Sequence, residues 1–225
     1  MKTRWTEKVT AENAWSEYPR PQFARKNWMN LNGMWEYAVT KKYHPRPDGY
    51  QGDILVPFCI ESALSGVRRT IEPGDRIWYR RLFEIPTDWH GKRVLLHFEA
   101  VDYAATVWIN GAVVGSHKGA YNRFSFNITD YISSDGAGEL IVCVDDPTSF
   151  GPQPRGKQQS VQQRIWYTPV SGIWQTVWLE PVSTEAHLQE VRITPDIDTG
   201  SVSVIPMLNE PMKPEYSVKA RASYK

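Results

Sequence analysis

Apolar and polar residues alternate with a period of two along much of this chain, and that period restricts its fold more than any other feature. Residues 124–129 read Phe-Ser-Phe-Asn-Ile-Thr, the pattern of a strand with one buried and one solvated face. Further runs rich in β-branched and aromatic residues span Tyr79–Ile85, Val94–Phe98 and Trp174–Leu179. Because helical periodicity is almost absent, the sequence predicts an all-β protein.

The dipeptide Asn110–Gly111 is the clearest turn signal in the chain. It joins the apolar runs Thr106–Ile109 and Ala112–Val114, and Asn-Gly in that position predicts a two-residue hairpin with a type I′ turn. Strands at this spacing, separated by clusters of Gly, Pro, Asn and Asp, are typical of an antiparallel sandwich.

Two long segments interrupt the strand pattern, and a separate group of strand-like runs follows Pro181. The segments Tyr43–Gly52 and Asp145–Gln163 are rich in Pro, Gly and polar residues, and loops of this length are usually functional or disordered. After Pro181, three strand-like runs follow at Leu188–Thr194, Ser201–Leu208 and Tyr216–Tyr224.

This last region is too short to close a sandwich of its own. We therefore expect a second domain that is incomplete in this chain, with disorder or intermolecular pairing beyond about Glu185. Its open strand edges would favour pairing between copies, so a homo-oligomer belongs to the expected partners.

The charge balance names no partner. Lys plus Arg number 26 against 25 Asp plus Glu, a net charge of +1, so we expect neither a nucleic acid nor an anionic membrane to be bound. The longest apolar runs fall far short of the ~20 residues of a membrane helix. No apolar stretch follows the charged N-terminus, which predicts a cytoplasmic protein, or a periplasmic or secreted one if a signal was removed.

Metal and cofactor signals are weak. Cys59 and Cys143 belong to no Cys-x-x-Cys pair, and Cys143 lies in an apolar run where a small buried side chain is expected. The five histidines show no close metal-binding spacing, so we expect no metal and no cofactor. Residues 151–158 have the spacing of a phosphate-binding loop, but Gln158 stands where Ser or Thr should bind magnesium.

Paired carboxylates are the chemistry of glycoside hydrolysis, but their separation cannot be read from a sequence. Asp102, Asp145 and Asp146 lie at strand ends or bends. The usual role of aspartate there is to form a turn by hydrogen bonding to the backbone, and we expect that role for all three.

Five strings in one order carry a resemblance to a known family. They are Asn30–Trp35 (NLNGMW), Trp78–Phe83 (WYRRLF), Val107–Gly111 (VWING), Gly119–Phe124 (GAYNRF) and Ser171–Glu180 (SGIWQTVWLE). Together they resemble the N-terminal sugar-binding domain of glycoside hydrolase family 2, the family of β-galactosidases, β-glucuronidases and β-mannosidases.

The resemblance implies a jelly-roll sugar-binding domain over residues 1–184 and the first strands of an immunoglobulin-like sandwich over 185–225. It further implies a (β/α)₈ barrel that carries the catalytic glutamates of a retaining β-glycosidase. Such a barrel needs ~250 residues. The chain itself therefore contains no catalytic residue under this reading, and we expect it to be inactive alone.

In this family the jelly roll implies loops at the rim of a pocket for a terminal β-linked sugar. By position, the candidate substrate-binding residues are Glu61, next to Phe58 and Ser62, and a set before the Ser-Gly-Ile string: Arg155, Gln163, Arg164, Trp166 and Tyr167. An aromatic face stacks on a pyranose, and Arg or Gln donates to its hydroxyls.

Alternatives stay open at several of these positions. Trp166 and Arg155 fit a packing role as well as a rim role, whereas Trp174 and Trp178, on an alternating strand, fit core packing better. The stretch Gln158–Tyr167 has no acidic residue, although β-galactosidases of the family carry a sugar-contacting Asp there. This departure argues against galactose specificity and leaves the sugar open.

A second hypothesis is a free-standing, lectin-like sandwich that binds glycans through a groove of exposed aromatic side chains. A third, a protein-interaction sandwich without a sugar role, is disfavoured by the five strings. The hypothesis of a glycosidase fragment, by contrast, predicts an apolar surface where a further domain would dock.

Overall fold

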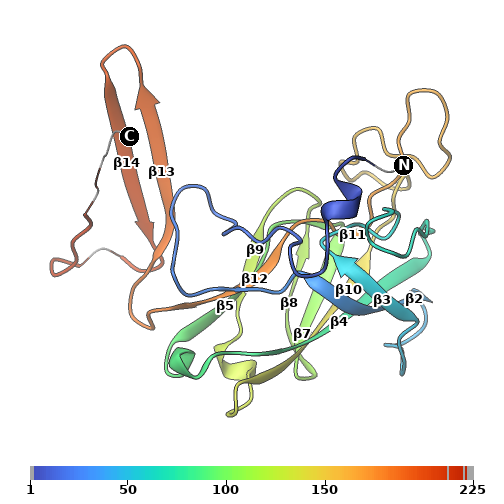
Figure 1. Ribbon diagram of the computed structural model, residues 1–225, viewed down its shortest axis with the longest axis horizontal. Helices are drawn as coiled ribbons and strands as arrows, with labels where there is room; N and C mark the ends of the chain where they lie inside the picture. Colours follow the sequence, from blue (N-terminus) through green and yellow to red (C-terminus); the bar gives the residue numbers. More distant parts are fainter. Residues whose placement is uncertain (1–2, 212, 220, 222–225) are drawn as a thin grey trace.

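The computed structural model describes residues 3–211, 213–219 and 221, and these form two packed antiparallel sheets followed by a hairpin (Figure 1). The four-stranded sheet has the order β1 (Met29–Asn30), β12 (Val177–Val182), β5 (Arg93–Phe98) and β9 (Phe124–Asn127). The six-stranded sheet has the order β3 (Gly52–Val56), β2 (Gly33–Lys41), β4 (Asp75–Glu84), β10 (Ala137–Asp145), β7 (Ala104–Ile109) and β8 (Ala112–Lys118).

The remaining strands form two separate pairs. Strands β6 (Val101–Asp102) and β11 (Gly172–Ile173) pair with each other, and β13 (Leu188–Asp196) and β14 (Ser201–Leu208) form the hairpin. Three turns of 3₁₀-helix lie at Thr6–Lys8, Thr87–Trp89 and Thr129–Tyr131. The prediction of an all-β antiparallel sandwich is confirmed. Among the described residues, no helix has the length and apolar character needed to cross a membrane.

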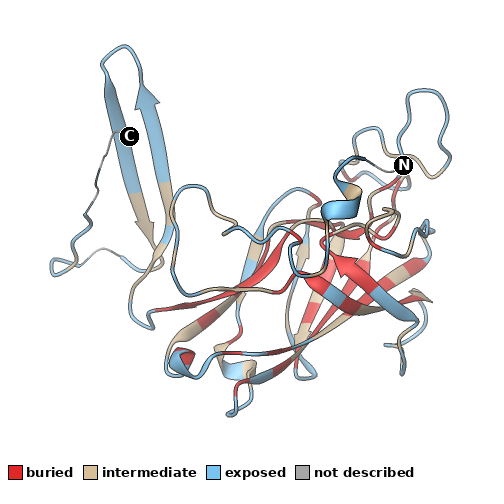
Figure 2. Ribbon diagram, in the orientation of Figure 1, coloured by how far each residue is buried: buried red, intermediate tan, exposed pale blue. Residues whose placement is uncertain are grey.

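The core lies between the two sheets and follows the alternation of the sequence. In β4, Ile77 and Tyr79 point inward, and in β12 Val177 and Leu179 do the same. Trp35 on β2 meets Tyr79 edge-on, with ring centroids 6.4 Å apart. Figure 2 shows that the buried residues concentrate in the two sheets, whereas the β13–β14 hairpin is largely exposed.

The turn at Asn110–Gly111 is the two-residue hairpin that the sequence predicts. Asn110 has φ of 49° and Gly111 has φ of 81°, and positive φ at both central residues is what a type I′ turn requires. The Asn110 amide also accepts from the Glu139 N–H at 2.8 Å and donates to the Tyr131 carbonyl at 2.9 Å. One side chain thus joins the β7–β8 turn to β10.

The outer face of the four-stranded sheet is covered by an N-terminal strap, residues 15–28. Trp178 and Glu180 of β12 point to this face and are nevertheless fully buried. Tyr18 packs edge-on against Trp178 at 5.3 Å between centroids, and Arg20 and Arg25 pair with the Glu180 carboxylate at 2.8 and 2.9 Å. Trp178 is buried, as expected, but it packs beneath the strap rather than in the core between the sheets.

A single buried carboxylate therefore joins the strap to the sheet. His97 Nε2 lies 3.1 Å from Glu180 Oε1, and Arg25 also donates to the Leu188 carbonyl at the start of β13, at 2.5 Å. Burial opposes ionisation of Glu180, but His97 and the charges of Arg20 and Arg25 together lower its pKa to about 2. The group stays ionised at any ordinary pH.

Three local predictions need correction or comment. The strand expected over Trp174–Leu179 begins only at Val177, because the Trp174 indole leaves the sheet and donates to the Ala120 carbonyl at 2.9 Å. Cys143 is buried and unpaired with Cys59, as expected. The third strand expected over Tyr216–Tyr224 is not formed by its described residues, 216–219 and 221; the others lie outside the described residues.

Candidate functional site

The Ser-Gly-Ile string forms the anchor of the long loop between β10 and β11, which we call the rim loop (residues 147–170). Ser171 is fully buried, and its hydroxyl donates to Asp146 Oδ2 at 2.6 Å. Its backbone N–H donates to Glu61 Oε2 at 3.0 Å. Segments near residues 61, 146 and 171 are thereby joined at one point.

The glycine of the string is needed for close approach. Gly172 has φ of 89°, in the left-handed region, and a Cβ there would lie 1.9 Å from the Tyr79 hydroxyl oxygen. Gly172 pairs with Asp102 of β6, and Ile173 is buried in the core. At this position the chain passes so close to Tyr79 that a residue larger than glycine would clash with it.

Further hydrogen bonds hold the rim loop along its length. Near its start, the Thr148 N–H donates to Asp146 Oδ1 at 2.7 Å, and Gln153 donates to the Thr148 carbonyl at 2.9 Å. In its middle, Gln158 donates to Asp102 Oδ2 at 3.4 Å and accepts from the Val170 N–H at 2.6 Å. The loop is therefore ordered by contacts at its start, middle and end.

Three carboxylates, those of Glu61, Asp102 and Asp146, gather beneath the loop. The negative charge of Asp146 opposes ionisation of the other two. Burial raises the pKa of Glu61 to about 7, against the opposing effect of the Ser171 donors, and the Asp146 charge adds to the rise. Burial also raises the pKa of Asp102 to about 7, with contributions from Asp146 and Glu61. Both groups titrate near neutrality.

Five of the six candidate substrate-binding residues lie together on the rim loop. These are Arg155, Gln163, Arg164, Trp166 and Tyr167, and all but the half-buried Arg155 are exposed. Trp166 and Tyr167 are 41% and 63% exposed, so their rings are available to a ligand. Lys157 stands 5.7 Å from the centroid of the Tyr167 ring.

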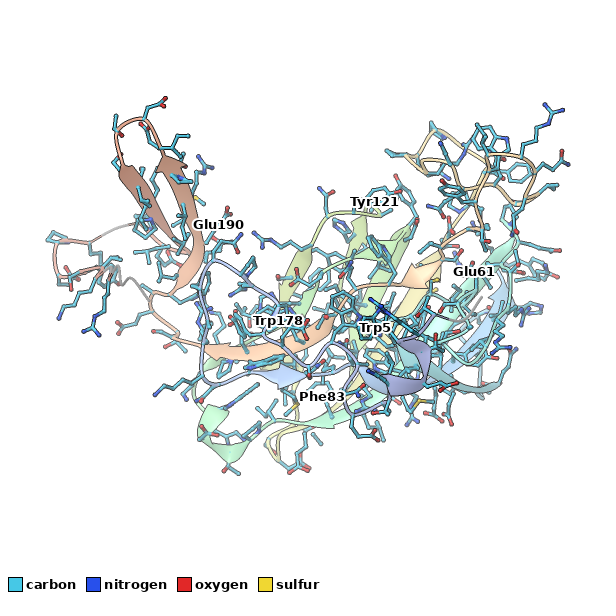
Figure 3. All side chains as sticks on the ribbon, turned by 45° about the horizontal axis from the view of Figure 1, so that its top comes forward. Trp5, Glu61, Phe83, Tyr121, Trp178 and Glu190 are labelled. Carbon is cyan, nitrogen blue, oxygen red and sulfur yellow. The ribbon has the colours of Figure 1, made fainter. Side chains whose placement is uncertain are left out.

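The sixth candidate, Glu61, occupies a different place. It lies beneath the rim loop on the sandwich side (Figure 3), with one oxygen on the Ser171 N–H. Its other oxygen, Oε1, is buried with no hydrogen-bond partner among the described residues. Glu61 thus contacts the end of the loop that carries the other five candidates, and it does not lie beside them.

The rim loop carries an apolar surface. Its exposed large apolar side chains are Phe150, Val161, Ile165, Trp166 and Tyr167, and Trp5 and Trp15 of the N-terminal segment are also exposed. Large contiguous patches of exposed apolar side chains mark interaction surfaces, whereas single ones are common on any protein.

Sequence reasoning missed the anchoring role of Asp102 and Asp146. Turn formation is correct for Asp146, whose carboxylate accepts from the Thr148 N–H. It is wrong for Asp145, which pairs with Arg76 at 3.1 Å, and for Asp102, which lies in β6 and accepts from Gln158. The adjacent pair Asp145–Asp146 at a strand end was the available signal, because alternation sends one carboxylate outward and the other inward.

The fold and the loop define a class: an antiparallel β-sandwich domain that presents one long, aromatic-rich loop from its surface. Residues 8–181 match the family model described as "Glycosyl hydrolases family 2, sugar binding domain", so the chain belongs to glycoside hydrolase family 2.

Relatives with this domain are β-glycosidases. The chain is 36% identical over 129 residues to a β-galactosidase of Thermoanaerobacter pseudethanolicus, covering 57% of this chain and 16% of that protein. It is 29% identical over 187 residues to a putative β-glucuronidase of Formosa agariphila, covering 80% and 21%. The chain thus spans about a fifth or less of the length of these two relatives.

Solved structures agree in fold. A β-glucuronidase of Bacteroides uniformis superposes with a TM-score of 0.51 at 27% identity, covering 72% of this chain and 18% of that one. The β-glucuronidase of Lactobacillus rhamnosus gives a TM-score of 0.64 at 18% identity, covering 84% and 34%. The second likeness concerns the fold alone.

Proposed function

We propose that this chain is the N-terminal, non-catalytic region of a retaining β-glycosidase and that its rim loop shapes the entrance of the substrate pocket. The observation that carries the proposal is the rim loop itself: a sugar-binding-domain sandwich holds it by buried hydrogen bonds while Trp166 and Tyr167 stay exposed.

The side chains of the loop suit a saccharide. The faces of Trp166 and Tyr167 can stack on the apolar side of a pyranose, and Arg155, Gln163 and Arg164 can donate to its hydroxyl or carboxylate oxygens. A charge-assisted hydrogen bond of about 1.5–3 kcal/mol corresponds to roughly 10- to 150-fold in affinity. Bond cleavage itself is assigned to catalytic glutamates outside these 225 residues.

Activity assays on two proteins test this proposal. The purified 225-residue chain and the product of the complete reading frame of its gene are assayed with 4-nitrophenyl β-D-glucuronide and β-D-galactoside. We expect turnover only when residues beyond this chain supply a barrel. Steady turnover by the purified chain alone would overturn the proposal.

A second candidate, lectin-like glycan binding, is favoured by one specific feature. A groove of about 450 Å³ runs between β5, β9 and the base of the β13–β14 hairpin, and its lining includes Arg93, Arg123, His187 and Asn127. Titration of glucuronic acid and galactose into the isolated chain tests it. Saturable binding that Arg123→Ala abolishes would favour this candidate, and no binding across the panel would exclude it.

A further inference from the structure

We propose that Asp146, Ser171 and Glu61 form a positioning unit that fixes the rim loop on the sandwich and thereby sets the placement of the pocket-lining side chains. This inference rests on the proposed function, because it assigns to these three residues the orientation of Arg164, Trp166 and Tyr167. None of the three needs to touch the sugar.

One carboxylate holds both ends of the loop. Asp146 follows the last residue of β10 and is 3% exposed, and Ser171 directly precedes β11. Asp146 Oδ2 accepts the Ser171 hydroxyl across 25 positions of sequence, while Oδ1 accepts the Thr148 N–H. Loss of this carboxylate releases the entry and the exit of the loop together.

Glu61 fixes the exit of the loop from another part of the sandwich. Its Oε2 takes the Ser171 backbone N–H, so Ser171 is held through both its backbone and its side chain. Gln158 adds a weaker attachment in the middle of the loop through Asp102 and Val170. The candidate rim residues 163–167 lie between this middle attachment and the exit.

The carboxylates beneath the loop influence one another through their charge. Glu61 faces Asp146, Cys59, Tyr79 and Ser171, and Asp102 faces Asp146, Glu61 and Gln158, so ionisation adds negative charge next to Asp146. Among the described residues, no group of three or more His, Cys, Asp or Glu side chains has the geometry to hold a metal ion.

The direction of the pH effect follows from these pKa values. We call the rim loop closed when it is attached to the sandwich and open when it is detached. With the pKa of Glu61 and of Asp102 raised to about 7 in the closed state, these carboxyls hold protons that they release when the loop opens. The closed state is therefore favoured below about pH 5, and this advantage is lost as the pH rises through 7. The loop should become more accessible between pH 6 and 8.5.

Trypsin cleavage of the chain tests the positioning unit, because the rim loop offers Arg155, Lys157 and Arg164 as sites. The cleavage rate is divided by that of a synthetic peptide of residues 147–170 at the same pH, which removes the pH dependence of the protease. We expect Ser171→Ala and Asp146→Ala to raise the corrected rate at least tenfold. We further expect Glu61→Gln to reduce the pH dependence between pH 6 and 8.5, with Asp102 left to titrate in that range.

The control is Asp145→Ala, a carboxylate one residue away that pairs with Arg76 and Lys42 on the outer face. We expect it to leave loop cleavage unchanged. Gln158→Ala is a milder lesion, for use if Ser171→Ala or Asp146→Ala fails to fold by circular dichroism, and it should raise cleavage in the same direction.

Unchanged cleavage in every folded variant, or an equal effect of Asp145→Ala, would overturn the positioning unit. Because this assay contains no sugar, such a failure leaves the pocket-rim proposal to its own activity assays.

Discussion

The hydroxyl oxygen of Tyr79 lies 1.9 Å from the position that a Cβ on Gly172 would occupy. Gly172→Ala must therefore displace a fully buried tyrosine or the chain that crosses it, and its φ of 89° is unfavourable for alanine. We expect a loss of about 2–4 kcal/mol in the free energy of unfolding, measured by urea denaturation. Gly49→Ala, which meets nothing within 4 Å, is the matched control and should cost less than about 1 kcal/mol.

The same contact predicts a rescue. Tyr79→Phe removes the hydroxyl that a Cβ at position 172 would strike, so it should restore part of the stability that Gly172→Ala loses. A double-mutant cycle should give a favourable coupling of at least about 1 kcal/mol. Strictly additive losses would show that the clash does not determine the need for glycine.

Removal of the Glu180 carboxylate should be the most costly change on the strap side of the sandwich. Glu180→Gln leaves Arg20 and Arg25 without their buried partner, and we expect a loss of about 3 kcal/mol in urea denaturation. Glu36→Gln, which breaks the ion pair with Arg80 on the more exposed outer face of the six-stranded sheet, should cost less than about 1 kcal/mol. Equal losses in the two variants would contradict the role of Glu180 in joining the strap to the sheet.

Low pH should weaken the attachment of the strap to the sheet through Glu180. Since the pKa of Glu180 is lowered to about 2 in the folded chain, its stabilising contribution is present above the ordinary carboxyl pKa of 4.5 and is lost as the pH falls toward 2. The difference in unfolding free energy between the wild type and Glu180→Gln should thus shrink from pH 6 to pH 3. A difference that stays constant over that range would contradict the assigned pKa.

The turn between β7 and β8 depends on Asn110. Asn110→Ala removes the bonds to the Glu139 N–H and the Tyr131 carbonyl and places alanine at a φ of 49°. We expect a loss of about 2 kcal/mol in thermal or urea unfolding. Asn122→Ala, at an exposed position before β9, should be close to neutral, and a comparable loss there would undermine this explanation.

Much of the fold could be predicted from the sequence, because its signals are local. The alternation in residues 124–129 and the Asn110–Gly111 turn depend on neighbouring residues only. The turn matches the structure, and the strand forms as β9 but ends at Asn127, because a 3₁₀ turn begins at Thr129. The sequence predicts that Trp178 packs, but it could not show that Trp178 and Glu180 are buried on the outward face of the sheet. This burial depends on the strap, whose Arg20 and Arg25 are distant in sequence from β12.

The candidate site shows the same division. The Ser-Gly-Ile string located the rim loop, and Arg164, Trp166 and Tyr167 do lie on one exposed segment. The partners of the string were beyond sequence reasoning, because Glu61 and Asp146 reach Ser171 from 110 and 25 positions away. The sugar-binding role of the six candidates stays a prediction.

The central claim is that the rim loop shapes the pocket of a longer β-glycosidase, and the kcat/KM of Arg164→Ala in the product of the complete reading frame tests it most directly. With the 4-nitrophenyl β-glycoside that the wild type cleaves best, we predict a loss of roughly 10- to 150-fold. Arg192→Ala, an exposed arginine on the β13–β14 hairpin, should leave kcat/KM unchanged. Wild-type kcat/KM in the Arg164→Ala protein would contradict the account.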